Sequence, residues 1–242
     1  CSKLAEWESI HYLRPMKKYL SIFLLVLLTN ISPGFAMAPS DSLSLEQMLL
    51  SQGLINIHSL DPDILVELKY STLDNFLGVD TYGELVNCYL QPKAASMLQE
   101  AQALLKNSHP ELTLLVYDGA RPRSIQRIMW TLVVNTPSQD YVANPDRGSV
   151  HNFGSAVDLT IATVNGVPLD MGTPFDFFGD LAQPRYEQKF LREKKLSQRQ
   201  IENRLLLREV MTKAGFLPIS IEWWHFNAIP VKQARAEYKI IE

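Results

Sequence analysis

The order of helical and extended segments constrains the fold of this chain more than any other feature. Helices are predicted where apolar side chains recur at helical spacing, over residues 92–107, 124–134 and 197–214. Strands are predicted where the chain has short apolar runs, over residues 64–70, 112–117, 156–163 and 219–226. Because the two kinds of segment do not alternate as regular βαβ units, we expect an α+β fold with helices packed on a largely antiparallel sheet.

Several residue types mark where these helices begin and end. Pro92 suits the first turn of its helix, where the missing backbone N–H costs no hydrogen bond. Ser197 and Gln200 have the spacing of a capping box, and Gly215 suits the end of the same helix. Residues 43–54 fit a short amphipathic helix or an ordered arm. In the helix at 124–134, the side chains expected to face inward are Ile125, Ile128, Met129 and Leu132.

The composition is that of an ordinary globular protein. The 242 residues carry a net charge of −3 and no long basic run, which argues against a nucleic-acid-binding protein. No Gly/Ser linker divides residues 39–242, so we expect a single domain there, large enough to bury a core without disulfides. Cys88, the one cysteine of that region, is expected to be a small buried apolar side chain. The strongly charged segment at 180–197 is expected to be a solvated loop or helix.

The first 38 residues differ from the rest of the chain. They carry a net charge of +2, whereas the remaining 204 residues carry −5. A basic start at 16–18, an apolar stretch at 19–28 and a small-x-small ending are typical of a secretory signal peptide that begins at Met16 and is cleaved after Ala36 or Ala38. The alternative is an uncleaved anchor helix, but a membrane span needs about 20 apolar residues. We therefore expect an exported, periplasmic protein without a membrane span after cleavage.

Two of the histidines stand in motifs that suggest a metal site. His151 begins an H-x6-D pattern that ends at Asp158, and His225 ends an E-x-x-H pattern that begins at Glu222. A catalytic zinc site needs about three protein ligands and an open position for water. His151, Asp158 and His225 supply two imidazoles and one carboxylate. Glu222 then fits as the base that takes a proton from the activated water.

The spacing of these residues requires an irregularity in the local strand structure. Residues three apart in a regular strand face opposite sides of the sheet, so we predict that a bulge or a strand end interrupts regular pairing between Glu222 and His225. Gly154 and Ala156 lie between the other two candidate ligands. Their small size either lets the backbone pass close to a metal and its substrate or simply allows tight packing.

Taken together, these motifs resemble those of the zinc D-alanyl-D-alanine dipeptidases, a family related to the zinc D,D-carboxypeptidases and to hedgehog-type domains. The resemblance covers most of the chain from residue 66 to residue 226. It is carried by S-x-H-x-x-G-x-A-x-D at 149–158, by E-W-W-H at 222–225, and by the segments at 69–78, 117–122, 171–178 and 203–216.

The resemblance implies one Zn2+ per subunit and a set of catalytic residues. His151, Asp158 and His225 match the zinc ligands, and Glu222 matches the catalytic base. Arg121 matches the arginine that stabilises the developing oxyanion. A stiff turn before Pro122 suits that role, because a fixed guanidinium stabilises a tetrahedral oxyanion best.

Three further residues match substrate-binding positions of the family. Asp176 matches the acidic residue near the free amino group of the substrate, and Tyr70 is expected to assist at that end through its hydroxyl. Ser149 matches a residue near the substrate carboxylate. From the residues alone, Asp176 and Ser149 are equally typical of turns, and Tyr70 of an aromatic core.

The function implied is hydrolysis of the dipeptide D-Ala-D-Ala to two D-Ala, with this small dipeptide as partner and no defined oligomeric state. One alternative is a zinc D,D-carboxypeptidase that trims peptidoglycan stem peptides. An alternative of another class is a metal-containing binding module without turnover, which the presence of Glu222 and Arg121 disfavours. Because the enzyme of vancomycin resistance works in the cytoplasm, the predicted export favours recycling of D-Ala-D-Ala during wall turnover over a role in resistance.

Overall fold

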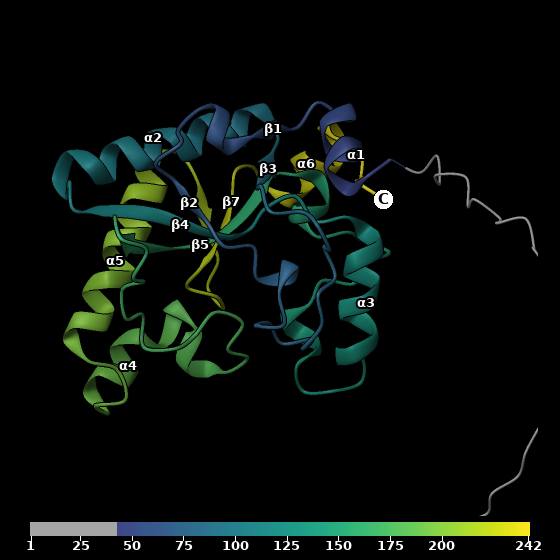
Figure 1. Cartoon of the computed structure of the whole chain (residues 1–242). Helices are drawn as coiled ribbons and strands as arrows, with labels where there is room; N and C mark the ends of the chain where they lie inside the picture. The colour runs from purple at the N-terminus through teal and green to yellow at the C-terminus, as the bar shows by residue number, and fades with distance from the viewer. Residues whose placement is uncertain (1–42) are drawn as a thin grey trace, which may run out of the picture. The chain divides into compact units, whose positions relative to one another are not determined.

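The architecture is that of a computed structural model, which describes residues 43–242. The expected signal peptide, the start at Met16 and the cleavage site lie outside these residues. The helices, labelled in Figure 1, are α1 (Leu45–Ser51), α2 (Pro92–Ser108), α3 (Arg123–Val133), α4 (Glu187–Arg192), α5 (Gln198–Lys213) and α6 (Val231–Glu237). The strands are β1 (Ile55–Asn56), β2 (Leu65–Val66), β3 (Tyr89–Leu90), β4 (Leu112–Asp118), β5 (Ala156–Thr163), β6 (Leu217–Pro218) and β7 (His225–Asn227).

The main sheet of the described region has the strand order β2-β4-β5-β7-β6. Strand β2 runs parallel to β4, whereas the pairs β4–β5, β5–β7 and β6–β7 are antiparallel. Strands β1 and β3 form a separate antiparallel pair. The expected α+β fold with a largely antiparallel sheet is therefore confirmed.

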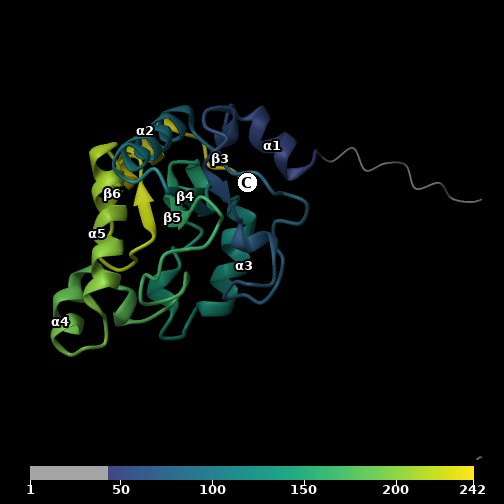
Figure 2. The ribbon, with the colours of Figure 1, turned by 60° about the vertical axis from the view of Figure 1, so that its left-hand side comes forward.

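Side-chain alternation along the strands gives the sheet two different faces. On one face, Leu114 and Val116 of β4 and Leu159 of β5 belong to the main apolar core, which α2 and α5 cover. In Figure 2 both helices lie to the left of the central strands β4 and β5. Asp158 lies next to Leu159 in β5, so its side chain projects from the opposite face. The helices thus bury one face and leave the other available for a polar site.

The helix ends follow the expected signals, but the orientation of α3 does not. Pro92 begins α2, and Ser197 and Gln200 form the predicted capping box of α5. Ile128 and Leu132 are 42% and 53% exposed, so the prediction that they face inward is wrong. The polar Gln126 takes an inward position instead, because its side chain is hydrogen-bonded in the interior of the protein.

Two predicted strands are shorter than expected. In the run at 64–70, only β2 is extended, and the 3-10 helix η2 (Lys69–Ser71) follows it. In the run at 219–226, regular pairing begins at His225, so Glu222 lies before the strand. The predicted interruption between Glu222 and His225 is therefore confirmed, although most of the predicted strand is absent.

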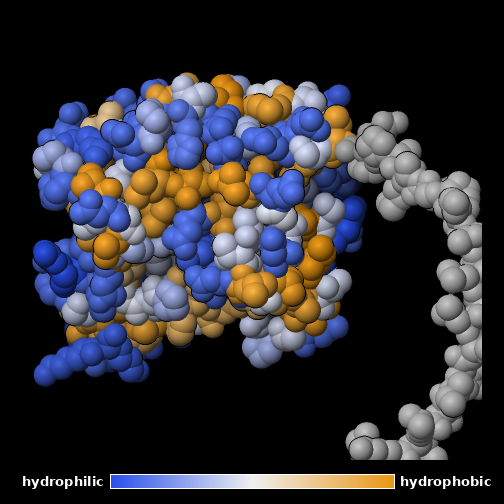
Figure 3. Space-filling view, in the orientation of Figure 1, coloured by the Kyte–Doolittle hydropathy of each residue, from blue (hydrophilic) through white to orange (hydrophobic). Residues whose placement is uncertain are grey.

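Further expectations concern the surface and the remaining cysteine. Cys88 is buried and free, as predicted, and burial raises the pKa of its thiol well above the usual range. The charged segment at 180–197 contains α4 and is not wholly solvated, because Glu187 is buried. Apolar residues form a band below α2 on the face shown in Figure 3, with hydrophilic residues on both sides of it. Among residues 43–242, no helix is both long enough and apolar enough to cross a membrane.

Candidate active site

Strand register places three polar residues side by side on the open face of the sheet. Asp158 of β5 is the direct partner of His225 of β7, and on its other side it is the partner of Asp118 of β4. The β4–β5 pairing is irregular between Val116 and Asp118, immediately before this row. Because cross-strand partners lie about 5 Å apart, the sheet by itself brings two of the predicted metal ligands together.

His151 reaches the same place from a short helix that precedes β5. The 3-10 helix η4 (Val150–Phe153) begins with a capping box in which Ser149 and Asn152 satisfy each other's backbone. Gly154 ends it in the left-handed region, with φ of 64°. A Cβ at Gly154 would lie 2.9 Å from Leu54, so tight packing against α1 and its following segment, rather than approach to a metal, explains its small size.

The second imidazole nitrogens of the two histidines have defined partners. Nδ1 of His151 lies 2.8 Å from the carbonyl oxygen of Gly119, and a carbonyl can only accept a hydrogen bond. Nε2 of His225 lies 3.0 Å from Oδ1 of Asn227. The contact with Gly119 places the ring proton of His151 on Nδ1 and leaves its Nε2 as an electron-pair donor. In His225 both ring nitrogens face oxygen atoms, so its Nδ1 can act as an electron-pair donor when Nε2 carries the proton toward Asn227.

Nε2 of His151 and Nδ1 of His225 lie close to each other and to the carboxylate of Asp158. Nε2 of His151 lies 3.1 Å from Nδ1 of His225, and the latter lies 2.9 Å from Oδ1 of Asp158. Oδ2 of Asp158 lies 3.4 Å from Nε2 of His151. One possible ligand atom from each of the three buried side chains lies within 4.8 Å of the other two, so His151, Asp158 and His225 could hold a metal ion. We refer to these three residues as the metal-type group. Although burial opposes the charge, the two imidazoles keep the pKa of Asp158 well below its usual range.

Glu222 lies beside this group, just outside the strand. Its Oε2 is 3.9 Å from Nδ1 of His225, and its side chain is 11% exposed. Burial raises the pKa of Glu222 to about 8. A carboxyl group with such a pKa exchanges protons near neutral pH, as a general acid–base requires.

Arg121 is held rigidly in the turn that follows β4. Its Nε donates to Oδ2 of Asp118 at 2.8 Å, Nη2 donates to the same oxygen, and Nη1 donates to Oε1 of Gln126 at 3.0 Å. Nη2 also lies 3.6 Å from Oδ2 of Asp158. The guanidinium is therefore a fixed buried charge next to the metal-type group and not a surface ion pair.

Backbone contacts join this turn to the helix that carries His151. The amide of Arg121 donates to the carbonyl oxygen of His151 at 3.0 Å. The side chain of Asn152 donates to the carbonyl oxygen of Arg121 at 2.7 Å. The guanidinium and the imidazole are thus positioned by one connected piece of structure.

Asp176 and Tyr70 form a second polar pair close to these residues. The hydroxyl of Tyr70 donates to Oδ2 of Asp176 at 2.9 Å, and the guanidinium of Arg121 lies 5.0 Å from the ring of Tyr70. Burial raises the pKa of Asp176 to about 8. Asp176 has a φ of 58°, a strained conformation for a residue other than glycine, and such strain is concentrated at functional sites.

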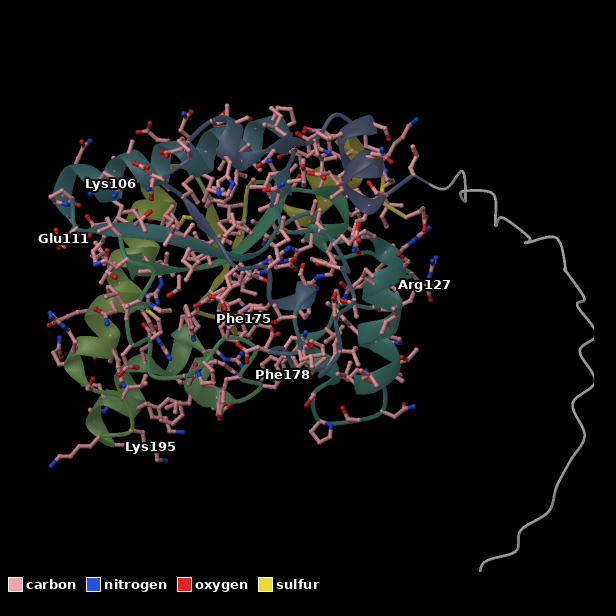
Figure 4. The ribbon with its side chains drawn as sticks, viewed as in Figure 1. Lys106, Glu111, Arg127, Phe175, Phe178 and Lys195 are labelled. Carbon is pink, nitrogen blue, oxygen red and sulfur yellow. The ribbon has the colours of Figure 1, made fainter. Side chains whose placement is uncertain are left out.

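The loop around Asp176 brings aromatic side chains to the centre of the molecule. Phe175 and Phe178 lie near the middle of the view in Figure 4, whereas Arg127 and Lys195 lie at its edges. The ring centroid of Phe175 lies 6.2 Å from that of Tyr70. These rings exclude water from the side of the site where Asp176 lies.

One cavity of about 330 Å3 connects all the residues that were predicted to act together. Its size suits a small ligand. The predicted site residues that line it are Tyr70, Arg121, Ser149, His151, Asp158, Asp176, Glu222 and His225. Ser149 also has a structural role, since its hydroxyl accepts the backbone hydrogen bond of the cap.

Sequence reasoning did not identify three side chains that support the site. Asp118, at the end of β4, is fully buried and also accepts a hydrogen bond from Tyr82 at 2.7 Å. Gln126 was hidden within a helix, and Asn227 follows His225 by two residues. That spacing in a strand places Asn227 on the same face as His225, which was a usable signal.

Comparisons with known proteins show the family of this chain. The pattern of the Peptidase M15 family, described as D-Ala-D-Ala dipeptidase, matches residues 50–240. The chain is 34% identical over 174 residues to the D-alanyl-D-alanine dipeptidase of Escherichia coli (strain K12), across 72% of this chain and 83% of that protein.

Two enterococcal proteins are also similar. Identity is 28% to the D-alanyl-D-alanine dipeptidase of Enterococcus faecalis (strain ATCC 700802 / V583), across 74% of this chain and 93% of that protein. Identity is 32% to the D-alanyl-D-alanine dipeptidase of Enterococcus faecium, across 66% of this chain and 83% of that protein. The matched family pattern covers most of the chain and includes every residue of the cavity described above, so the chain belongs to the D-Ala-D-Ala dipeptidase family of peptidases.

Proposed function

We propose that the protein is a zinc-dependent dipeptidase that hydrolyses D-Ala-D-Ala to two molecules of D-Ala. The observation that carries the proposal is the single cavity in which a metal-type group, a protonatable carboxyl and a fixed guanidinium meet. Membership of the family and the names of the similar proteins supply the substrate.

His151, Asp158 and His225 would hold one Zn2+, because two neutral imidazoles and a carboxylate are a common ligand set of catalytic zinc. When bound, zinc acts as a Lewis acid that polarises a carbonyl oxygen and acidifies water. Gly119 and Asn227 keep the ring protons of the histidines away from the ion.

Glu222 is the general acid–base of the proposed reaction. Its carboxylate takes a proton from the attacking water while the water oxygen bonds to the scissile carbonyl carbon. It then gives that proton to the nitrogen of the leaving D-Ala as the peptide bond breaks. A pKa of about 8 suits a group that both accepts and releases a proton.

Arg121 and Asp176 orient the substrate. The guanidinium of Arg121, which Asp118 fixes, stabilises the negative charge that develops on the carbonyl oxygen. Asp176 pairs with the free α-ammonium, and the hydroxyl of Tyr70 orients its carboxylate. Ser149 contacts the carboxylate at the other end of the dipeptide. Recognition of a free ammonium by a partly buried acid would favour dipeptides over longer chains.

The decisive experiment measures D-Ala released by the zinc-loaded protein from D-Ala-D-Ala and from N-acetyl-D-Ala-D-Ala. Rapid release from the first and slow release from the second would support the dipeptidase. Equal or faster release from the acetylated substrate would support a D,D-carboxypeptidase. Release from neither substrate would point to a binding module. Metal analysis of the protein purified without added metal tests the choice of zinc.

We also propose that the enzyme is exported and recycles D-Ala-D-Ala from cell-wall turnover. This proposal rests on the signal-like sequence at 16–38 alone. Fractionation of cells that express the chain from Met16 tests it. The full activity is expected in the periplasmic fraction, and the amino terminus of the mature chain is expected just after residue 36 or 38.

A further inference from the structure

A buried arginine of α5 is bonded to both ends of the loop that carries Asp176. The side chain of Arg204 is 1% exposed although it lies on a helix with a charged surface. Its Nε donates to the carbonyl oxygen of Met171 at 2.6 Å, and its Nη2 donates to that of Leu181 at 3.1 Å. Met171 lies five residues before Asp176 and Leu181 five residues after it. The guanidinium of Arg204 therefore connects the two ends of the loop.

Other side chains of α5 hold the start of the same loop. Nε2 of Gln200 donates to the carboxylate of Asp170 at 2.8 Å. Nδ2 of Asn203 donates to the carbonyl oxygen of Asp170, also at 2.8 Å. Hydrogen bonds from three residues of α5 thus hold this end of the loop: Gln200, Asn203 and Arg204.

Arg204 also contacts the segment that carries Glu222, the proposed general base. The guanidinium of Arg204 lies 6.0 Å from the ring centroid of Trp223, which follows Glu222. The indole nitrogen of Trp223 donates to the hydroxyl of Thr173 in the loop at 2.8 Å. Arg204 therefore contacts both the loop of Asp176 and the residue next to Glu222.

The conformation of Asp176 explains why such support is needed. A φ of 58° lies in the left-handed region, which residues other than glycine seldom occupy, and Asp176 keeps this conformation where its surroundings define the backbone. Arg204 can supply this restraint because it stays charged. Burial lowers the pKa of its guanidinium to about 10, and the carboxylate of Glu187 lies 3.7 Å from Nη1.

We propose that Arg204 is a positioning residue that fixes Asp176 relative to Glu222 and so sets the selectivity of the enzyme for a free α-amino group. Its guanidinium touches neither substrate nor metal. It acts through the two loop carbonyls and through Trp223. The inference rests on the proposed function, since it concerns how the amino end of the dipeptide is recognised.

The test compares Arg204→Lys with Arg208→Lys. Arg208 lies one turn further along α5 and pairs with the same Glu187 at 2.7 Å, but its side chain makes no hydrogen bond to the loop within the described residues. For each zinc-loaded variant, kcat and KM are measured on D-Ala-D-Ala and on N-acetyl-D-Ala-D-Ala. Amide hydrogen exchange of residues 172–180 is measured without substrate.

We expect Arg204→Lys to lower the ratio of the two kcat/KM values about tenfold, mainly through a higher KM for the free dipeptide, since small displacements of a positioning group cost one to two orders of magnitude. Exchange in residues 172–180 is expected to accelerate. Arg208→Lys is expected to change neither quantity more than about twofold, because lysine keeps the charge beside Glu187 and Arg208 makes no hydrogen bond to the loop within the described residues. If Arg204→Lys does not fold, Thr173→Val provides the second variant, because it removes the link between the loop and Trp223 and is expected to shift the ratio in the same direction.

The outcomes separate this inference from the proposed function. Unchanged exchange and an unchanged substrate ratio in Arg204→Lys would overturn the positioning role, even with a fully active enzyme. Failure of the wild-type protein to release D-Ala would instead overturn the proposed function, and the exchange measurement would still show whether Arg204 restrains the loop.

Discussion

Asp158 and His225 are direct cross-strand partners, and Oδ1 of Asp158 lies 2.9 Å from Nδ1 of His225. The sheet therefore brings two of the three residues of the metal-type group together through backbone pairing alone. His151 joins this pair from η4, whose position depends on caps and on the turn of Arg121. The three side chains differ accordingly in how they are supported, and this difference leads to separate tests.

Asp158→Asn is expected to abolish stable metal binding. An amide does not supply the negative charge that offsets a divalent ion among two neutral imidazoles, so the metal content is expected to fall from about one per chain to below a tenth. Elemental analysis after dialysis measures the content. Asp140→Asn is the control, because Asp140 is exposed and lines the same cavity outside the metal-type group. Full metal content in Asp158→Asn would remove Asp158 from the ligand set.

Glu222→Gln is expected to keep the metal and lose turnover. The substitution preserves shape but removes the proton-transfer group, so kcat should fall by roughly 10²- to 10⁴-fold. Steady-state kinetics with elemental analysis of the same sample provide the measurement. The matched control is Glu209→Gln, which changes an exposed carboxylate of α5. A Glu222→Gln enzyme with wild-type kcat would show that another group carries the proton.

Asn227→Ala is expected to weaken metal binding about 10- to 100-fold, because the partner that orients the ring of His225 is lost. Asn227→Asp keeps an acceptor oxygen at this position and should retain most of the affinity. Competition with a coloured chelator gives both dissociation constants. Equal losses in the two variants would indicate that the oxygen of Asn227 does not orient the ring.

Asp118→Ala is expected to lower the free energy of unfolding by about 3–5 kcal/mol, since it leaves the buried charge of Arg121 without its main partner. Urea denaturation of the metal-free protein measures the change. Glu209→Ala removes an exposed pair with Lys213 and should cost less than about 1 kcal/mol. A similar small loss in Asp118→Ala would mean that Arg121 finds an equivalent partner.

Asp176→Asn is expected to make the metal-free protein less sensitive to alkaline pH. Burial raises the pKa of Asp176 to about 8 from an ordinary value of 3.8, so the folded state holds this proton more tightly than the unfolded state. The contribution of this proton to the free energy of unfolding is fully present below about pH 4 and is lost as the pH rises towards 8. Asparagine tolerates a positive φ, so the backbone is preserved.

Urea midpoints at pH 5 and pH 9, in the presence of a chelator, provide the comparison for this variant. We expect the wild type to lose more stability than Asp176→Asn between the two pH values. Parallel losses in the two proteins would contradict a buried, protonated Asp176.

The sequence by itself determined the main helices, the central strands and eight of the residues that line the cavity. Periodicity located α2 and α5, and local capping residues marked their ends, because both signals depend on neighbours within a few positions. The motif at 149–158 and the pair Glu222 and His225 indicated the site, since their chemistry requires these residue types. The spacing of that pair also predicted the strand end between them, which the structure confirms.

Only the tertiary structure decided which residues support that chemistry. Arg204 gave no local signal, because it acts through carbonyl oxygens more than 20 residues away in the chain. Asp118 and Gln126 lie three and five residues from Arg121, but only the folded turn directs their side chains toward its guanidinium. The same applies to Ile128 and Leu132, which face solvent because a polar side chain takes the inward position in α3. Residue type and spacing define a metal-type motif, but burial and long-range hydrogen bonds determine how rigidly its groups are held.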